Sequence, residues 1–481
     1  MLRAVGRVLV LVAVILSGGL LTGMMWLPVE KTPERTRLFL YEKPPRTSRF
    51  AWPVWSSVQD DLQSFNNTHK QTQEVRESDV TIEKLGKVFE TRCNSLYASF
   101  KGQLISTEEG YLPDKFSGYE LALVQVLTRH GDRAPLKGIP LADLSSFQCP
   151  DDKHYFADAD TAMKTSNKCS RGRLTWNGCR QHETLGQHLK SIYHLDTKSI
   201  RSRTMVVSTD YQRTIQSAKC LIGGLLGHQN YRPIWKLPGT MFQMEKTGYL
   251  PNCPSIDVLW QETQKRTEFL HAKQKWYNIK TKLKQFFSQI NRRLRSNQGP
   301  IEFYEGLICN YCQLNSSERS RMVTPCIKGH CLPPSLGEEI IKTADIYTKL
   351  HNQEKSAILQ IQPFISQVVT KFRKWIEGAR RDRVVVYSGH DTTLAALLTA
   401  LHAFDGHRPP YASRIVFELW KRPQVKNDFI VRTLYNGQVI NSDIISECMN
   451  FQQFEKNLLT GTLRSKESHA KGCLYGSIEL Q

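Results

Sequence analysis

Acidic residues are scarce in this 481-residue chain relative to basic ones. Asp and Glu together number 45 against 65 Lys and Arg, which gives a formal net charge of +20. A field of this sign favours acidic partners such as nucleic acid, anionic lipid, sulfated sugars or phosphorylated substrates. Zinc-finger, RNA-recognition and helix-turn-helix patterns are all missing, so we expect no nucleic acid among the partners.

The sequence also lacks a carboxylate cluster that would hold a cation, and we expect no metal and no other cofactor. The stretch that comes nearest to a metal site is Cys309-Asn310-Tyr311-Cys312, which is followed by Cys326 and Cys331. Its spacing superficially resembles that of zinc ligands. The chain has 12 cysteines, a number more typical of an oxidising compartment, so disulfides are the preferred interpretation and zinc is the alternative.

An Ala-x-Ala cleavage pattern does not follow the first apolar stretch. Arg3 and Arg7 precede an uncharged run at 8–27, close to the ~20 residues that span a bilayer as a helix. Because the positive charges lie before the run, we predict a cytoplasmic tail at 1–7, a signal-anchor helix at 8–27 and a lumenal remainder. A cleaved signal peptide is the alternative.

Residues 28–115 are predicted to form a lumenal stem and N-terminal extension, because their first part is rich in proline and charge. The stretch from 80 to 110 is partly helical in pattern, and Cys93 is a candidate tie between it and the catalytic body. Sequons at Asn66 and Asn315 are predicted glycosylation sites and agree with a lumenal address.

Three apolar runs with the composition of buried strands each end in polar, chemically capable residues. They lead into Arg129-His130-Gly131-Asp132-Arg133, Thr209-Asp210-Tyr211-Gln212-Arg213 and Ser388-Gly389-His390-Asp391. The predicted fold is α/β, with a mostly parallel sheet and flanking helices at 116–225 and 363–481. The stretch at 226–362 has helical periodicity and is predicted to be an inserted helical cap. Thr175 and Asp210 are candidate caps for helices in the body.

The three junctions are expected to meet, because ligands of open α/β sheets bind outside the carboxyl ends of the strands. Two arginines beside His130 are costly unless an anion lies between them, and guanidinium forks fit phosphate oxygens. Arg213 in the first turn of a helix opposes the helix dipole unless it shares an anion with it. We therefore predict that Arg129, Arg133, Arg213 and His390 bind phosphate; a solvated surface cluster is the alternative.

The chemistry that fits these residues is transfer of a phosphoryl group through a covalent intermediate. Neutral His130 would attack phosphorus and become phosphohistidine. Asp391 would protonate the leaving alkoxide and later assist the attack of water. The arginines would neutralise the charge that spreads over the phosphoryl oxygens, so the reaction requires no metal.

These motifs in combination resemble the histidine acid phosphatases, whose fold is of the phosphoglycerate-mutase type. The matching stretches are Arg-His-Gly-Asp-Arg at 129–133, Ser-Thr-Asp-x-x-Arg-Thr at 208–214, His-Asp-Thr-Thr at 390–393, Leu-Thr-x-x-Gly at 174–178 and Pro-Pro-Tyr-Ala-Ser at 409–413. The resemblance implies that His130 accepts the phosphoryl group and that Asp391 donates the proton. Arg129, Arg133, Arg213 and His390 would then bind the phosphate.

The long stem and the basic charge set the chain apart from the prostatic and lysosomal members and resemble a Golgi branch of the family. That resemblance implies a single-pass type II Golgi membrane protein that removes the 2-phosphate of xylose in the glycosaminoglycan–protein linkage region of proteoglycans. A homodimer is expected, because the family often dimerises. The alternatives are a broad-specificity acid phosphatase, a mutase-like transferase and a non-catalytic glycan-binding relative.

Overall fold

The computed structural model describes residues 10–16, 19–25, 82–93, 112, 116–136, 147–150, 167–227, 241–244, 253–290, 292–295, 297–314, 324–327, 329–460 and 473. The chain divides into two units, Met1–Ser57 and Val58–Gln481. The predicted tail at 1–7 and the sequons at Asn66 and Asn315 lie outside the described residues.

In the first unit, strands β1 (Val10–Leu16) and β2 (Gly19–Met25) pair antiparallel. This pairing differs from the helix predicted over 8–27. Valine and isoleucine favour strands, which is a local reason for this pairing. Among the helices of the described residues, none combines the length and the apolar character needed to cross a membrane. The membrane anchor therefore stays a prediction.

The second unit contains a mixed sheet with a mostly parallel core, as predicted. Strands β3 (Glu120–Arg129), β10 (Val384–Gly389), β6 (Thr204–Thr209) and β7 (Met241–Met244) run parallel in that order. On the other side of β3 lie β11 (Arg414–Lys421), β12 (Phe429–Tyr435), β13 (Gln438–Val439) and β14 (Met449–Asn450), paired antiparallel. The three predicted catalytic strands therefore end at one edge of the sheet.

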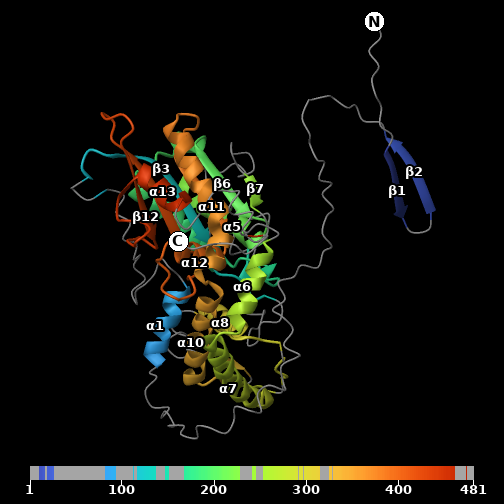
Figure 1. Cartoon of the computed structure of the whole chain (residues 1–481). Helices are drawn as coiled ribbons and strands as arrows, with labels where there is room; N and C mark the ends of the chain where they lie inside the picture. Colours follow the sequence, from blue (N-terminus) through green and yellow to red (C-terminus); the bar gives the residue numbers. More distant parts are fainter. Residues whose placement is uncertain are drawn as a thin grey trace. The chain divides into compact units, whose positions relative to one another are not determined.

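Helices cover both faces of this sheet because both faces of its strands are apolar. On β3, Val124 and Val126 pack with the helices of one face, α3 (Trp176–Ile192), α4 (Thr197–Arg201) and α5 (Gln212–Leu226). Leu123 and Leu127 pack with those of the other, α11 (Glu354–Ile376), α12 (Asp391–Ala400) and α13 (Phe451–Thr460). Figure 1 shows α11 lying along the sheet.

The region predicted as a cap is mainly helical. It contains α6 (Pro254–Gln264), α7 (Thr267–Gln289), α8 (Pro300–Gln313), α10 (Pro334–His351) and a hairpin of β8 (Cys326–Ile327) and β9 (His330–Cys331). Within this unit, Figure 1 shows α7, α8 and α10 gathered at one end, beside α1 (Ile82–Cys93). The predicted boundary at 362/363 falls inside α11, whose Ile358 and Ile361 already pack on the sheet, and β7 lies within the predicted cap range although it pairs with β6 of the sheet.

Disulfides account for three of the four cysteines in the zinc-like pattern. The described pairs are Cys93–Cys312, Cys149–Cys169, Cys179–Cys220, Cys253–Cys473 and Cys326–Cys331, the second of which joins β4 (Gln148–Cys149) to the residues after β5 (Asn167–Lys168). Cys309 is a buried free thiol. Cys93 does tie the N-terminal extension to the rest, but its partner lies in α8 of the cap and not in the α/β body.

Candidate active site

The three predicted junctions meet at the carboxyl edge of the sheet. The backbone N–H of His130 donates to the carbonyl of Gly389 at 3.0 Å, so the pairing of β3 with β10 extends as far as the histidine. The imidazole rings of His130 and His390 lie 5.7 Å apart, edge to face. His390 Nε2 lies 2.9 Å from the Thr209 hydroxyl at the end of β6. The structure therefore brings the predicted residues together, while their roles stay predictions.

The loop after β3 is pressed against the first turn of α3. A Cβ atom at Gly131 would lie 2.3 Å from the carbonyl oxygen of Gly178, and one at Gly178 would lie 2.1 Å from that of Asp132. Gly131 is not among the glycines with positive φ, so its backbone conformation does not require a glycine. A glycine is needed here because a side chain would collide with α3. Thr175 caps α3 as predicted, since its hydroxyl accepts from Gly178 N–H at 3.1 Å.

His130 is held as a neutral imidazole with a defined tautomer. Its Nδ1 lies 2.8 Å from the carbonyl oxygen of Gly131. Because a carbonyl can only accept, Nδ1 carries the proton and Nε2 keeps the lone pair that a nucleophile needs. Burial, followed by the positive charges of Arg213, Arg129 and Arg133, holds the pKa of His130 well below its usual range.

Arg129 and Arg133 are fixed by partners beside the histidine. Arg129 Nη1 donates to the carbonyl of Pro409 at 2.6 Å, and its guanidinium lies 4.2 Å from the ring centre of Tyr411. Arg133 Nη2 donates to Glu305 Oε2 at 2.7 Å. Burial works against the charged form of Arg133, but Glu305 raises its pKa above the usual range. Both guanidiniums are therefore preorganised before any ligand binds.

Arg213 lies in the first turn of α5, with Nη2 3.4 Å from His390 Nδ1. If Nδ1 accepts this contact, His390 Nε2 carries the proton and donates to Thr209. Burial, followed by the charge of Arg213, lowers the pKa of His390 to about 3, so the ring is neutral. Burial likewise lowers the pKa of Arg213 to about 10. The predicted cap Asp210 is not the N-cap of α5; that residue is Tyr211, which makes no side-chain cap bond.

Asp391 begins α12, where the helix dipole favours a carboxylate. Its Oδ2 forms ion pairs with Arg129 Nη2 at 3.1 Å and with Arg408 Nε at 2.8 Å, and Oδ1 accepts from the N–H of Thr392 at 2.9 Å. Burial alone would raise the pKa of Asp391. Arg129 and then Arg408 outweigh burial and hold it well below its usual range.

Two residues of this site, Glu305 and Arg408, are absent from the sequence-based prediction. Glu305 in α8 accepts from Arg133 and, at 3.1 Å, from Arg408 Nη2. Arg408 stands directly before the Pro-Pro-Tyr-Ala-Ser motif, and that position was an available signal. Nothing in the helical pattern of α8 distinguishes Glu305 from a solvated surface carboxylate.

The site carries an excess of positive charge and has unsatisfied donors. Four guanidinium groups, those of Arg129, Arg133, Arg213 and Arg408, face the two carboxylates of Asp391 and Glu305, which leaves two formal positive charges. Within the described part of the chain, the buried Nε atoms of Arg129, Arg133 and Arg213 have no hydrogen-bond partner. Buried donors are normally satisfied, so this arrangement suits a doubly charged oxyanion such as a phosphate monoester.

Asp132, whose role the sequence leaves open, makes contacts within the protein around the loop that follows β3, among them a hydrogen bond from the backbone amide of Arg133. Its carboxylate accepts from the Thr175 hydroxyl at 2.7 Å and from the amide of Gln313, the last residue of α8. Burial raises the pKa of Asp132 to about 6. Asp132 therefore joins the loop after β3 to α3 and to the cap, which is a structural role.

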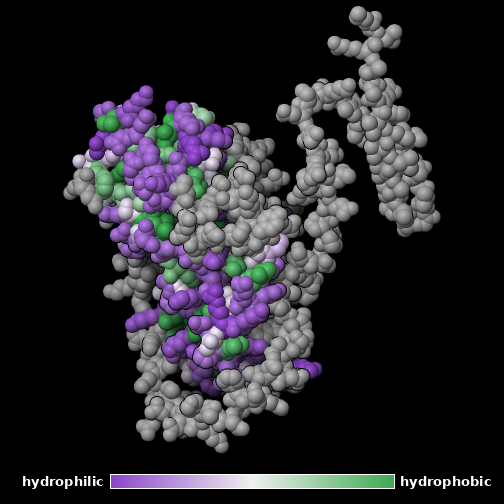
Figure 2. Space-filling model, viewed as in Figure 1, coloured by the Kyte–Doolittle hydropathy of each residue, from purple (hydrophilic) through white to green (hydrophobic). Residues whose placement is uncertain are grey.

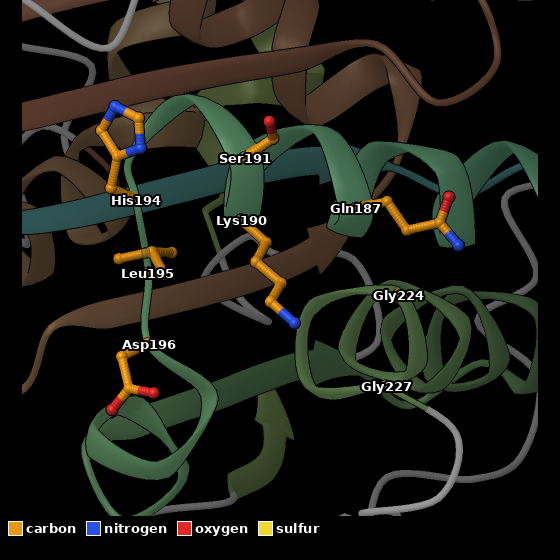
Figure 3. Close-up of a pocket in the computed structure, with 8 residues that line it drawn as sticks. All are labelled: Gln187, Lys190, Ser191, His194, Leu195, Asp196, Gly224 and Gly227. Carbon is orange, nitrogen blue, oxygen red and sulfur yellow. The ribbon is translucent and has the colours of Figure 1, made fainter.

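A separate hollow of about 590 Å³ lies at the other end of α3 and α5 (Figure 3). It is lined by Lys190, His194 and Asp196 among others, and contains none of the predicted site residues. Because α3 has 17 residues, its two ends are ~25 Å apart.

The face in Figure 2 is mostly hydrophilic over the described residues, with hydrophobic residues scattered across it.

The family model of the histidine phosphatase superfamily (branch 2) matches residues 120–436. This chain belongs to that family. It is 29% identical over 385 residues to 2-phosphoxylose phosphatase 1 of Xenopus tropicalis, covering 72% of each chain. It is 27% identical over 326 residues to human lysosomal acid phosphatase, covering 63% of this chain and 67% of that one.

Among solved structures, the phytase of Citrobacter braakii superimposes with a TM-score of 0.48 at 14% identity, covering 72% of this chain and 99% of the phytase. The family match and the phosphatase relatives identify the chain as a phosphatase, a hydrolase of phosphoric monoesters. Every residue of the predicted site lies within the matched range.

Proposed function

We propose that this phosphatase works through a phosphohistidine intermediate on His130. His130 Nε2 attacks phosphorus and the bond from phosphorus to the ester oxygen breaks, while Asp391 passes a proton to the leaving alkoxide. Asp391, now a carboxylate, takes a proton from water, which attacks phosphorus and breaks the P–N bond. The observation that carries this proposal is a neutral, buried imidazole with a free Nε2 beside two excess positive charges.

The proposed substrate is a sugar phosphate, the 2-phosphate of xylose in the glycosaminoglycan–protein linkage region. The name of the relatives, 2-phosphoxylose phosphatase, supports this choice, and the net charge of +20 would attract an acidic glycan. Tyr211 is 36% exposed next to His390 and Arg213, with ring centres of Tyr211 and His390 5.0 Å apart. An exposed aromatic ring at this place suits the apolar face of a sugar ring. A broad-specificity acid phosphatase is the second candidate, favoured by the lysosomal relatives.

The proposed location is the Golgi lumen, with the N-terminal segment as a type II anchor. The five described disulfides fit an oxidising compartment. If the proposal is right, glycosidase treatment lowers the apparent mass of the cellular protein, and substitution of Asn66 and Asn315 removes that shift. A protein without glycans and accessible to protease from the cytoplasmic side would contradict it. A homodimer is also proposed, to be tested by sedimentation.

The central experiment compares phosphorylated linkage oligosaccharide with phosphotyrosine, a phospholipid and a nucleotide monophosphate. We expect kcat/KM to be at least tenfold higher for the oligosaccharide. His130→Ala is expected to abolish hydrolysis of every substrate, and His130 in the wild type to become labelled by a phosphorylated substrate after acid-free quenching. Turnover that survives in His130→Ala contradicts the mechanism, and equal rates on all substrates favour the broad-specificity candidate.

A further inference from the structure

Glu305 and Arg408 complete a continuous chain of alternating charges through the site. It runs from Arg133 to Glu305, then to Arg408, Asp391 and Arg129, with contacts of 2.7, 3.1, 2.8 and 3.1 Å. The side chains of Arg408 and Glu305 are only 12% and 10% exposed. Arg408 Nε and Arg129 Nη2 approach the same oxygen, Oδ2 of Asp391, at ion-pair distance. The carboxylate thus lies between two cations.

The position of Arg408 is set by two further parts of the chain. Arg92 in α1 donates from Nη1 to the carbonyl of Arg408 at 2.9 Å. Asp345 in α10 pairs with Arg92 Nη2 at 3.0 Å and lies 2.9 Å from His407 Nδ1. The α1 helix precedes the range matched by the family model, yet it holds the backbone from which Arg408 reaches Asp391.

We propose that Arg408 is a positioning residue for Asp391, held in place by Glu305 and by Arg92, and that it controls when Asp391 gives up or takes a proton. The inference rests on the proposed function, because it takes Asp391 as the proton donor. Asp391 must be protonated in the first step and ionised in the second. A substrate dianion competes for Arg129, which leaves Arg408 as the cation that still contacts Asp391.

Glu305 weakens the effect of Arg408 on Asp391, because the guanidinium of Arg408 pairs with both carboxylates. The charged and titratable groups that face Asp391 are Arg129, Arg133, Arg213, His390, Glu305 and Arg408. Both imidazoles at the site are neutral, so the arginines dominate. Loss of one close opposite charge raises a carboxyl pKa by about 1 to 3 units.

The test compares wild type with Arg408→Met, Arg408→Lys and Glu305→Gln, using an alkyl phosphate and nitrophenyl phosphate between pH 4 and 8. In Arg408→Met, we expect the alkaline limb of kcat on the alkyl phosphate to move up by about 1 pH unit. Arg408→Lys is expected to restore most of the wild-type profile, and Glu305→Gln to move it down. Nitrophenolate leaves without a proton, so kcat on nitrophenyl phosphate is expected to show no such movement of the alkaline limb.

The control is Arg422→Met, which removes an exposed arginine paired with Asp428 at 3.4 Å. Arg422 follows β11 at its far end, ~27 Å from the site edge, and its variant is expected to keep the wild-type profile. If Arg408→Met fails to fold, Arg92→Gln removes the backbone bond to Arg408, and we expect a smaller shift in the same direction.

Two failures can be told apart. Asp391→Asn is expected to slow alkyl phosphate far more than nitrophenyl phosphate. Equal slowing would overturn the assignment of Asp391, and this inference with it. If Asp391→Asn behaves as expected but the pH profile of Arg408→Met or Arg92→Gln does not move, the positioning role alone is overturned, and a uniform loss of kcat in Arg408→Met would then mark Arg408 as structural.

Discussion

Substitution of Gly131 by alanine tests whether the catalytic loop depends on its close contact with α3. The added Cβ would meet the carbonyl oxygen, carbonyl carbon and Cα of Gly178 at 2.3, 2.7 and 2.7 Å. Ordinary van der Waals contact begins near 3.4 Å, so the backbone of the loop or of α3 must move by about 1 Å. All three obstructing atoms belong to the main chain, so no side-chain rotation relieves the contact.

The displacement would fall on the residue before Gly131, which is the proposed nucleophile. A misplacement of about 1 Å in a catalytic geometry can reduce the rate by about 10²-fold. Overpacking of a well-packed region costs about 1–3 kcal/mol of unfolding free energy, which a domain of ordinary stability survives. We therefore expect Gly131→Ala to fold, with kcat/KM for nitrophenyl phosphate lowered about 10²-fold.

Gly389→Ala is the matched control, because Gly389 directly precedes His390 on the neighbouring strand. A Cβ there would have its nearest contact at 3.5 Å, with the Thr393 hydroxyl, which is ordinary van der Waals contact. We expect this variant to stay within threefold of wild type. Both proteins would be assayed with nitrophenyl phosphate and by thermal unfolding. Activity of Gly131→Ala close to wild type, or an equal loss in Gly389→Ala, would refute the steric argument.

Three further predictions concern the stability of the fold and the contact with the sugar of the substrate. Burial works against the charged form of His402, but Glu354 at 3.1 Å and Asp443 at 2.8 Å raise its pKa. The resulting stability is fully present below the ordinary histidine pKa of about 6.5 and is lost as pH rises through the raised value. His402→Gln should therefore cost about 0.5–1 kcal/mol at pH 5 and less at pH 8 in urea titrations; equal losses would contradict this. Tyr211→Ala should lower kcat/KM for the sugar phosphate about tenfold while inhibition by inorganic phosphate changes little; an equal effect on both would count against a sugar contact. Joint replacement of the Cys93–Cys312 pair by serine should lower the unfolding free energy by about 2–5 kcal/mol, and an unchanged melting temperature would argue against that link.

The strand-to-helix junctions could be predicted because their chemistry follows directly from local sequence. Apolar runs that end at Arg129, Thr209 and Gly389 indicate buried strands, and the carboxyl-edge rule brings their ends together. The capping role of Thr175 could be predicted in the same way, because a threonine directly before an amphipathic helix is a typical N-cap. These inferences need only short stretches of chain and one general property of parallel sheets.

The features that the sequence did not predict depend on contacts between distant segments. Glu305 meets Arg133 across 172 positions and Arg408 across 103, and no periodicity marks such a pair. The close backbone contact between Gly178 and Gly131 likewise results from the packing of two segments that are distant in the sequence, and not from a local turn. The predicted domain boundary at 362/363 falls inside α11, because burial on the sheet outweighs the local cost of a proline within that helix.

The same charges that hold the ligand-free site together link substrate binding to proton donation. Asp391 shares Arg129 with the place where phosphate is proposed to bind, so a dianion that draws Arg129 toward itself also weakens the contact that keeps Asp391 ionised. Binding of phosphate and protonation of Asp391 should therefore favour each other, as linkage requires of any two coupled equilibria. Inorganic phosphate should accordingly bind more tightly as pH falls toward the carboxyl range, and Asp391→Asn should remove that dependence. If the affinity for phosphate changes with pH in the same way in Asp391→Asn as in wild type, phosphate binding and protonation of Asp391 are independent.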